Sequence, residues 1–465
     1  MGIYLSKPNI VLVVFDTLRW DFFQRFLSGD YVFSETLKDF VSCETAFAPT
    51  SWTLPSHFSL FTGLYPSEHG IHESPDSEMD DIYRRSVKWK GNFLTQTASE
   101  LGYQTIGISA NPMISGLTGF DKRFDIFYNV DMGVLFNFNR GYRQGSIRHE
   151  TTKKSHRDFS FFKSLSPFYA LMKREKSHIV SVLRGYPKNK GHTMAFSFLQ
   201  KTPISRPFFV FFNLMEMHDP YSQIFFQDNN FLILRDLFAI HTLSRRRLKS
   251  YQMAYFRNIE QIKIFITNLI DYLKRKGLYG NSLIIFTSDH GQAFKEHNYY
   301  GHGVYLWDEL IHIPLLIKFP DNYVLDRNDL NYVNLVDLYH LMKAVMEDNT
   351  ELARFLNHDQ TFAESFGMQY SKSSLRKYVR STSKAYDIFK EANIPRKSII
   401  KNGIKLTING RSEVEEYSSL TKAKIHDLDF HAVNDLLFEL EIFSGNTGFN
   451  IDKSIIADGF FGSNE

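Results

Sequence analysis

Residues 9–16 read Asn-Ile-Val-Leu-Val-Val-Phe-Asp, a run of apolar and mostly β-branched side chains that ends in a carboxylate. Residues 283–291 read Leu-Ile-Ile-Phe-Thr-Ser-Asp-His-Gly, so Asp289 and His290 follow a second apolar run. Runs of this length and composition are typical of buried strands. Because ligands of α/β sheets collect beyond the carboxyl ends of the strands, we expect Asp16 and Asp289 to share one cation.

Two further side chains complete this predicted site. His290 would add a nitrogen ligand, and Thr53, in the segment Thr-Leu-Pro-Ser-His at 53–57, would add a hydroxyl oxygen whose proton a cation helps to remove. Each segment alone has a simpler interpretation, since an Asp at a strand end is often a helix N-cap and Asp-His-Gly can be a turn. The presence of all segments in one chain, with Thr-Gly-Leu-Tyr-Pro at 62–66, favours the site.

Strands and helices alternate along the chain, which predicts an α/β protein. A Lys-Asn-Gly turn at 401–403 between two short apolar runs predicts a β-hairpin. Residues 355–396 are polar and predict no clear element. We expect strands at 10–15, 104–109, 208–213 and 283–286, hairpin strands at 398–400 and 404–408, and helices at 30–40, 57–62, 95–101, 251–276, 333–346 and 432–439.

The composition is that of a soluble enzyme of ordinary polarity, with 43% hydrophobic and 23% charged residues among 465. A net charge of +3 gives no field that would argue for nucleic acid as a partner. Cys43 is the only cysteine, so no intrachain disulfide can form, which fits a reducing compartment. Residues 1–9 lack a signal-peptide pattern and no apolar run approaches the ~18–20 residues of a transmembrane segment. We therefore expect a cytoplasmic protein.

Four segments, in this order, carry a family pattern. They are residues 9–21 (NIVLVVFDTLRWD), 48–70 (APTSWTLPSHFSLFTGLYPSEHG), 217–221 (MHDPY) and 288–317 (SDHGQAFKEHNYYGHGVYLWDELIHIPLLI). Together they resemble the sulfatase-like branch of the alkaline phosphatase superfamily. The resemblance implies a doubly wound, mostly parallel α/β sheet flanked by helices over residues 1–320, and a smaller C-terminal α+β subdomain over 321–465. It also implies hydrolysis or transfer of a phosphate or sulfate ester at a metal-bound nucleophile.

The chain departs from the sulfatase pattern at the nucleophile. Sulfatases proper carry Cys or Ser in the pattern Cys/Ser-x-Pro-Ser-Arg, and this residue is oxidised to formylglycine. Thr53 stands here instead, and oxidation of its secondary alcohol would give a ketone. His57 replaces the arginine of the pattern, and the usual Asp-Asp pair is Asp16 followed by Thr17. The set resembles the members that process phosphate, such as phosphodiesterases and lipoteichoic acid synthases, and a threonine alkoxide beside a cation suits phosphoryl transfer.

Four more residues are candidates for substrate contact. His218, in Met-His-Asp-Pro-Tyr, matches a family histidine that faces the ester or leaving group, which implies substrate binding or general-acid catalysis. His302 stands where sulfatases often place a substrate-binding lysine, and it can contact the same oxyanion. Asn111 follows a predicted strand. For His57, substrate contact and helix packing are equally open.

The ligand set points to one divalent ion held by Asp16, Thr53, Asp289 and His290. Its mixed oxygen and nitrogen character favours Mn²⁺ or Zn²⁺, with Ca²⁺ or Mg²⁺ as alternatives. The leading function is a metal-dependent hydrolase or transferase of phosphomonoesters or phosphodiesters, carried by a small molecule, a glycan or a lipid. A sulfatase is the second hypothesis. A catalytically inactive protein of the same fold that binds an anion or a glycan is the third.

Residues 136–201 are rich in basic and aromatic side chains, which predicts a helical insertion. One interpretation is a solvated basic face on this insertion. The other is a lid that guides an anionic or lipid-phosphate substrate toward the metal, whereas no nucleic-acid recognition fold is visible.

Overall fold

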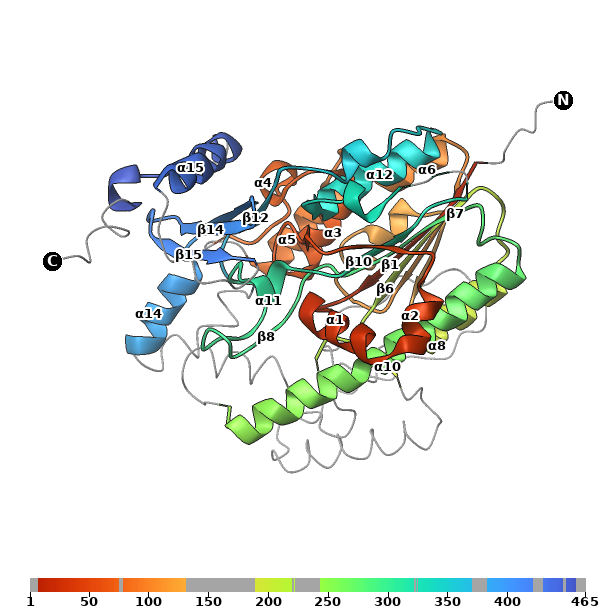
Figure 1. Ribbon diagram of the computed structural model, residues 1–465, viewed down its shortest axis with the longest axis horizontal. Helices are drawn as coiled ribbons and strands as arrows, with labels where there is room; N and C mark the ends of the chain where they lie inside the picture. The colour runs from red at the N-terminus through yellow and green to blue at the C-terminus, as the bar shows by residue number, and fades with distance from the viewer. Residues whose placement is uncertain are drawn as a thin grey trace, which may run out of the picture.

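The computed structural model describes residues 7–74, 78–130, 189–219, 221, 243–321, 323, 325–369, 383–420, 430–445 and 449–456. Its centre is a seven-stranded sheet with the strand order β2-β10-β7-β1-β6-β4-β5 (Figure 1). Neighbours from β7 to β5 run parallel, whereas β10 is antiparallel to both β7 and β2. The strands are β1 (Asn9–Phe15), β2 (Val41–Cys43), β4 (Gln104–Ser109), β5 (Ile126–Asn129), β6 (Phe208–Leu214), β7 (Ser282–Thr287) and β10 (Leu315–Lys318).

The central strands are apolar because they are covered on both faces. Every residue of β1, β6 and β7 is buried, as expected for a parallel sheet between two layers of helices. Side chains alternate along a strand, so Leu12 and Val14 enter the core on one face, whereas Val13 and Phe15 enter the core on the other. The predicted doubly wound, mostly parallel α/β fold is confirmed.

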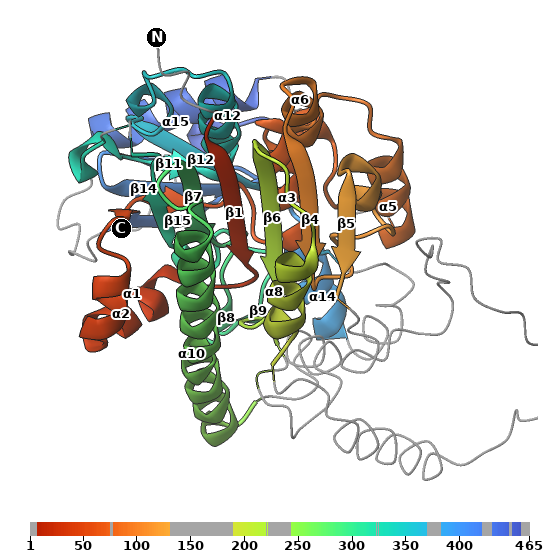
Figure 2. The same cartoon turned by 90° about the vertical axis from the view of Figure 1, so that its right-hand side faces the viewer.

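Helices lie on both faces of the sheet. Figure 2 looks onto the sheet with α8 and α10 in front of it. The core of this face also takes side chains from α1 and α2, and the opposite core takes them from α3, α5, α6 and α12. The bounds are α1 (Trp20–Gly29), α2 (Tyr31–Thr36), α3 (Thr53–Thr62), α5 (Met79–Lys88), α6 (Leu94–Glu100), α8 (His192–Lys201), α10 (Arg245–Arg275) and α12 (Leu335–Met346).

A four-stranded antiparallel sheet, in the order β12-β13-β14-β15, forms near the C-terminus. The predicted hairpin is confirmed, because β13 and β14 pair around Asn402 and Gly403, both of which have positive φ. The core of this sheet includes α15, and Figure 1 shows both at one end of the molecule. The elements are β12 (Gln360–Ser365), α14 (Ser383–Ala392), β13 (Arg396–Lys401), β14 (Ile404–Asn409), β15 (Val414–Ser419) and α15 (Phe430–Ser444).

Some helices end at other residues than predicted. The elements without a counterpart among the predicted ranges include β2, β5, β10, β12, β15, α1, α5 and α14. The helix predicted at 30–40 is confirmed in part, because α2 covers Tyr31–Thr36 and ends earlier than predicted; Asp30 accepts a hydrogen bond from the Phe33 amide and caps α2. Of the predicted insertion at 136–201, only 189–201 lie within the described residues, so the lid hypothesis falls outside them. No helix in the described residues has the length and apolar character that a membrane crossing requires.

Candidate active site

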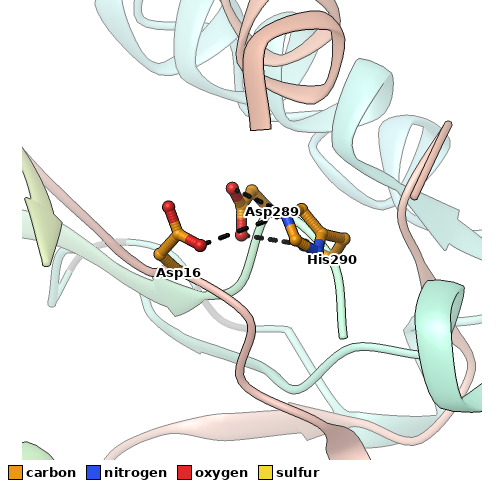
Figure 3. Close-up of side chains that lie close together, drawn as sticks. All are labelled: Asp16, Asp289 and His290. Carbon is orange, nitrogen blue, oxygen red and sulfur yellow. Dashed lines mark hydrogen bonds and ion pairs between the residues drawn. The ribbon is translucent and has the colours of Figure 1, made fainter. Parts of the chain in front are cut away.

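Asp16, Asp289 and His290 meet beyond the ends of β1 and β7 (Figure 3). All three side chains are fully buried. Nε2 of His290 lies 3.5 Å from Oδ2 of Asp289 and 4.0 Å from Oδ1 of Asp16. The pairing of Val14 with Thr287 explains this arrangement, because it brings two parallel strands to the same edge just before each carboxylate.

A positive charge would stabilise the two buried carboxylates of this trio. Asp16 Oδ1 and Asp289 Oδ2 are buried and have no hydrogen-bond donor in the described structure. Burial, and then the charge of Asp289, raise the pKa of Asp16 to about 6, and burial raises the pKa of Asp289 to about 7. Nδ1 of His290 donates to the carbonyl of Gly291 across 2.8 Å, which leaves the lone pair of Nε2 on the side of the carboxylates. The three residues therefore fit a metal site.

The backbone fixes the orientation of Asp289. Its other oxygen, Oδ1, accepts hydrogen bonds from the amides of Thr17, at 3.1 Å, and His290, at 2.9 Å. Thr17 can donate in this direction because its φ is 64°, in the left-handed region. Thr17 thus supports the site through its backbone, at the position where the sulfatase pattern has a second carboxylate.

Thr53 is the first residue of α3 and lies directly beside the trio. Its hydroxyl oxygen Oγ1 is 3.4 Å from Oδ2 of Asp16 and 3.3 Å from Nε2 of His290. The free amide groups of a helix N-terminus attract anions. All ten residues of α3 are buried, so packing on all sides fixes the position of the helix and of the Thr53 hydroxyl at its start. The four predicted metal ligands are therefore brought together.

Asn111 and His57 each contact at least one of the four predicted metal ligands. Nδ2 of Asn111 donates to Oδ2 of Asp16 across 2.6 Å, and its Oδ1 accepts from the amide of Met113. Both polar atoms of the Asn111 side chain thus have protein partners, and substrate contact by Asn111 stays a prediction. Nδ1 of His57 donates to the carbonyl of Thr53 across 2.8 Å.

Helix packing is the interpretation that the geometry favours for His57. The ring is fully buried, and Nε2 accepts a hydrogen bond from the side chain of Asn213 across 3.0 Å. Burial lowers the pKa of His57 to about 3, so the ring is neutral. No ring nitrogen of His57 remains for a substrate oxygen.

His218 and His302 lie beside the trio, and their pKa values are shifted in opposite directions. The ring centroid of His302 is 4.6 Å from that of His290 and 5.3 Å from that of His218. Burial opposes a charge on His218, but the hydrogen bond to Asp219 and the charge of Asp16 raise its pKa to about 9. Burial and the neighbouring histidines hold the pKa of His302 well below its usual value. His218 can therefore donate a proton, whereas His302 stays neutral.

The comparisons with known proteins agree with this geometry. Residues 8–347 match the protein family described as Sulfatase. The chain belongs to the Sulfatase family. It is 20% identical to an arylsulfatase of Clostridium perfringens over 388 residues, which are 73% of this chain and 74% of the relative.

Solved structures show the same fold at lower identity. The phosphonate monoester hydrolase SpPMH from Silicibacter pomeroyi superposes with a TM-score of 0.60 at 14% identity, over 96% of both chains. BT4656 in complex with its substrate D-glucosamine-2-N,6-O-disulfate gives a TM-score of 0.60 at 13% identity, over 96% of this chain and 99% of that one. The chain is thus a sulfatase-family hydrolase that acts on esters.

One residue at the site of this family member was missed in the sequence. Lys190 precedes α8, is almost fully buried, and donates a hydrogen bond from Nζ to the carbonyl oxygen of His218. No motif marks Lys190, which falls in the stretch interpreted as a basic insertion. Only the packing of α8 beside the turn that follows β6 reveals the contact.

Proposed function

We propose that this sulfatase-family protein hydrolyses or transfers phosphate esters through Thr53, with one divalent ion held by Asp16, Asp289 and His290. The placement of the Thr53 hydroxyl carries the proposal, since Oγ1 lies 3.4 Å from Asp16 Oδ2 and 3.3 Å from His290 Nε2. A bound ion would lower the pKa of this hydroxyl and neutralise charge on the non-bridging oxygens of the ester.

Thr53, the start of α3 and His218 each have a separate role in the proposed reaction. The Thr53 hydroxyl gives its proton to solvent water and Oγ1 attacks phosphorus in line, while the amides of Thr53 and Leu54, at the start of α3, face the non-bridging oxygens. The bond from phosphorus to Thr53 forms as the bond to the leaving oxygen breaks, and His218 gives its proton to that oxygen. Water or an acceptor alcohol then releases the phosphoryl group from Thr53, which gives ping-pong kinetics.

The chemistry of threonine supports phosphate over sulfate as the substrate. A secondary alcohol cannot yield the aldehyde from which formylglycine draws its nucleophile, whereas it can attack phosphorus directly. The likeness to a phosphonate monoester hydrolase is in line with this choice. The match to an arylsulfatase favours sulfate esters as the second candidate.

A nucleophile test separates these functions. The wild type, Thr53→Ala and Thr53→Ser are assayed on aryl phosphate monoesters and diesters, phosphonates and sulfates, with Mn²⁺, Zn²⁺, Mg²⁺ or Ca²⁺. We expect the wild type to turn over phosphate esters, Thr53→Ala to lose at least about 10³-fold, and Thr53→Ser to retain activity. Thr62→Ala removes the same atoms from the other end of α3 and serves as the control.

Acid trapping identifies the intermediate. Peptide mass spectrometry after a quench at low pH should show one added phosphoryl group on the peptide that carries Thr53. Turnover by Thr53→Ala at the wild-type rate would refute the nucleophile. Turnover of sulfates alone would establish a sulfatase, and tight binding of an ester without turnover would establish the inactive binding protein.

A further inference from the structure

A second group of charged residues lies beside the active site, around the turn that carries His218. Lys190 is 8% exposed, and its Nζ donates to the carbonyl oxygen of His218. Burial lowers the pKa of the Lys190 ammonium to about 8, and the charges of Asp219, Glu216 and Asp16 partly oppose this shift. Lys190 thus connects the start of α8 to the catalytic edge of the sheet.

Hydrogen bonds from α8 and from α10 hold the turn that follows β6. The amide of His192, at the start of α8, donates to Oε1 of Glu216 across 3.0 Å. Nδ2 of Asn258, on α10, donates to the carbonyl of Glu216, also across 3.0 Å. These contacts hold residue 216, whereas in the described structure Lys190 holds the backbone of residue 218 itself.

The backbone at residue 218 determines where the His218 ring points. Nδ1 of His218 donates to the carbonyl oxygen of Asp219 across 2.8 Å. Oδ1 of Asp219 also lies 3.2 Å from Nδ1. Because both contacts tie Nδ1 to residue 219, Nε2 is the ring nitrogen left for a leaving oxygen, and its direction follows the backbone of residues 218–219. Any movement of that backbone would change the distance from Nε2 to the leaving oxygen, and misplacement of about 1 Å can cost about 10²-fold in rate.

A purely structural role does not explain a lysine at this position. Burial of an ammonium costs free energy unless charges or hydrogen bonds compensate it. No carboxylate of the described residues lies within 4.0 Å of Lys190 Nζ, which donates to the His218 carbonyl and lies 5.7 Å from the centroid of the Tyr221 ring. A methionine would fill a similar volume without this cost, and costly residues of this kind cluster at functional sites.

We propose that Lys190 is a positioning residue, which holds the turn so that His218 can protonate the leaving group. The inference rests on the proposed function, in which His218 is the general acid. It assigns Lys190 no contact with the substrate. Loss of its ammonium should therefore impair the same step as loss of the His218 ring.

A double-mutant cycle on leaving-group dependence tests this role. The kcat and KM of two aryl phosphodiesters, and of two aryl sulfates, one ester of each pair with a good and one with a poor leaving group, are measured for wild type, His218→Ala, Lys190→Met and the double variant. We expect His218→Ala to lower kcat for the poor leaving group by about 10²–10⁴-fold. Lys190→Met should lower it by about 10- to 100-fold, with less than about a threefold change for the good leaving group.

The cycle also has an expected non-additivity. In the His218→Ala background, Lys190→Met should have little further effect, because the two changes act on one step. Lys190→Arg, which keeps a donor, should recover part of the loss. Lys201→Met, at the exposed end of α8, should behave as wild type.

Each other outcome overturns the proposal. Equal losses on both leaving groups, additive effects of the two substitutions, or a rise in KM alone would each show that Lys190 does not act through His218. If Lys190→Met fails to fold, the same comparison is made with Lys190→Gln. A selective loss in His218→Ala without one in the Lys190 variants refutes the inference alone, whereas Thr53→Ala with wild-type turnover refutes the proposed function.

Discussion

Asn213 donates a hydrogen bond from Nδ2 to Nε2 of the buried His57 ring, across 3.0 Å. The bond joins the end of β6 to the helix that begins with Thr53, and the other ring nitrogen of His57 donates to the Thr53 carbonyl. The neutral imidazole thus connects α3 to the central sheet at the position where the sulfatase pattern has an arginine. This arrangement assigns His57 a structural contribution that can be measured.

His57→Ala should weaken the fold more than it weakens substrate binding. The change leaves a buried cavity and removes two hydrogen bonds, so we expect the free energy of unfolding to fall by about 2–4 kcal/mol. Urea denaturation measures this loss, and His297→Ala, whose side chain is 42% exposed, is the control. An unchanged stability together with a raised KM would instead make His57 a substrate contact.

Glu73 makes the stability of the fold depend on pH, and this effect does not involve Asp16, Asp289 or His290. Glu73 accepts hydrogen bonds from Nε1 of Trp52, the residue before Thr53, across 2.5 Å, and from the amide of Phe366 across 2.8 Å. Burial raises the pKa of Glu73 from 4.5 to about 7. Between these values the folded state binds a proton that the unfolded state has lost, so stability falls as the pH rises through 7.

Glu73→Gln removes this titration. The difference in unfolding free energy between wild type and variant should shift by about 3 kcal/mol in favour of the variant between pH 4 and pH 8. Urea denaturation across this range measures the shift, and Glu68→Gln, on an exposed residue, is the control. Parallel curves for wild type and Glu73→Gln would contradict the prediction.

The sequence predicted the parts of the site that lie on strand ends. Asp16 and Asp289 follow continuous apolar runs, and parallel strands bring their carboxyl ends to one edge whatever the intervening chain does. Thr53 was placed beside them from the segment Thr-Leu-Pro-Ser-His at 53–57, and the family resemblance supports the same position. Lys190 was out of reach, because its contact with His218 spans 28 residues and depends on how α8 packs.

The C-terminal sheet was only partly predictable for a related reason. The Asn-Gly turn predicts the pairing of β13 with β14. The sequence of β12, Gln-Thr-Phe-Ala-Glu-Ser, lacks the apolar pattern that predicts a strand. Glu364 is buried on this strand, where it forms an ion pair with Lys397 across 2.5 Å on the neighbouring strand. Pairing of this kind is a tertiary contact, which a single stretch of sequence does not encode.

The charge balance of the site predicts which esters it prefers. Two carboxylates would offset a divalent ion, and the carboxylates of Asp219, 3.2 Å from Nδ1 of His218, and Glu216 would offset the charges of His218 and Lys190. His57 and His302 are neutral where the sulfatase pattern has an arginine and a lysine. Little net positive charge remains among the described residues of the site, so singly charged esters should be favoured over doubly charged ones.

For one leaving group, kcat/KM should be at least about tenfold higher for a phosphodiester or a phosphonate monoester than for the phosphomonoester. His302→Lys should narrow this ratio, because it returns a positive charge to the position where the sulfatase pattern has one. Steady-state kinetics at one pH and one metal concentration give the ratio. A wild-type preference for the phosphomonoester would show that the site carries more positive charge than this balance allows.

Metal content tests the trio at the strand ends. Wild type should hold about one divalent ion per chain, because Asp16 Oδ1 and Asp289 Oδ2 are buried without a donor among the described residues. Asp289→Asn keeps the shape of the side chain but removes its charge, so elemental analysis should find a large loss of the ion. Asp219→Asn, a buried carboxylate beside His218, should keep it and is the matched control.

The same ion should stabilise the fold. An ion present at about 100 times its Kd adds about 2.7 kcal/mol to the free energy of unfolding. Chelation should therefore lower the melting temperature of wild type and of Asp219→Asn, while Asp289→Asn should melt at the same temperature with or without chelator. Equal metal content in wild type and Asp289→Asn, or an equal response of both to chelation, would show that the ion binds elsewhere and that Asp16, Asp289 and His290 are not its ligands.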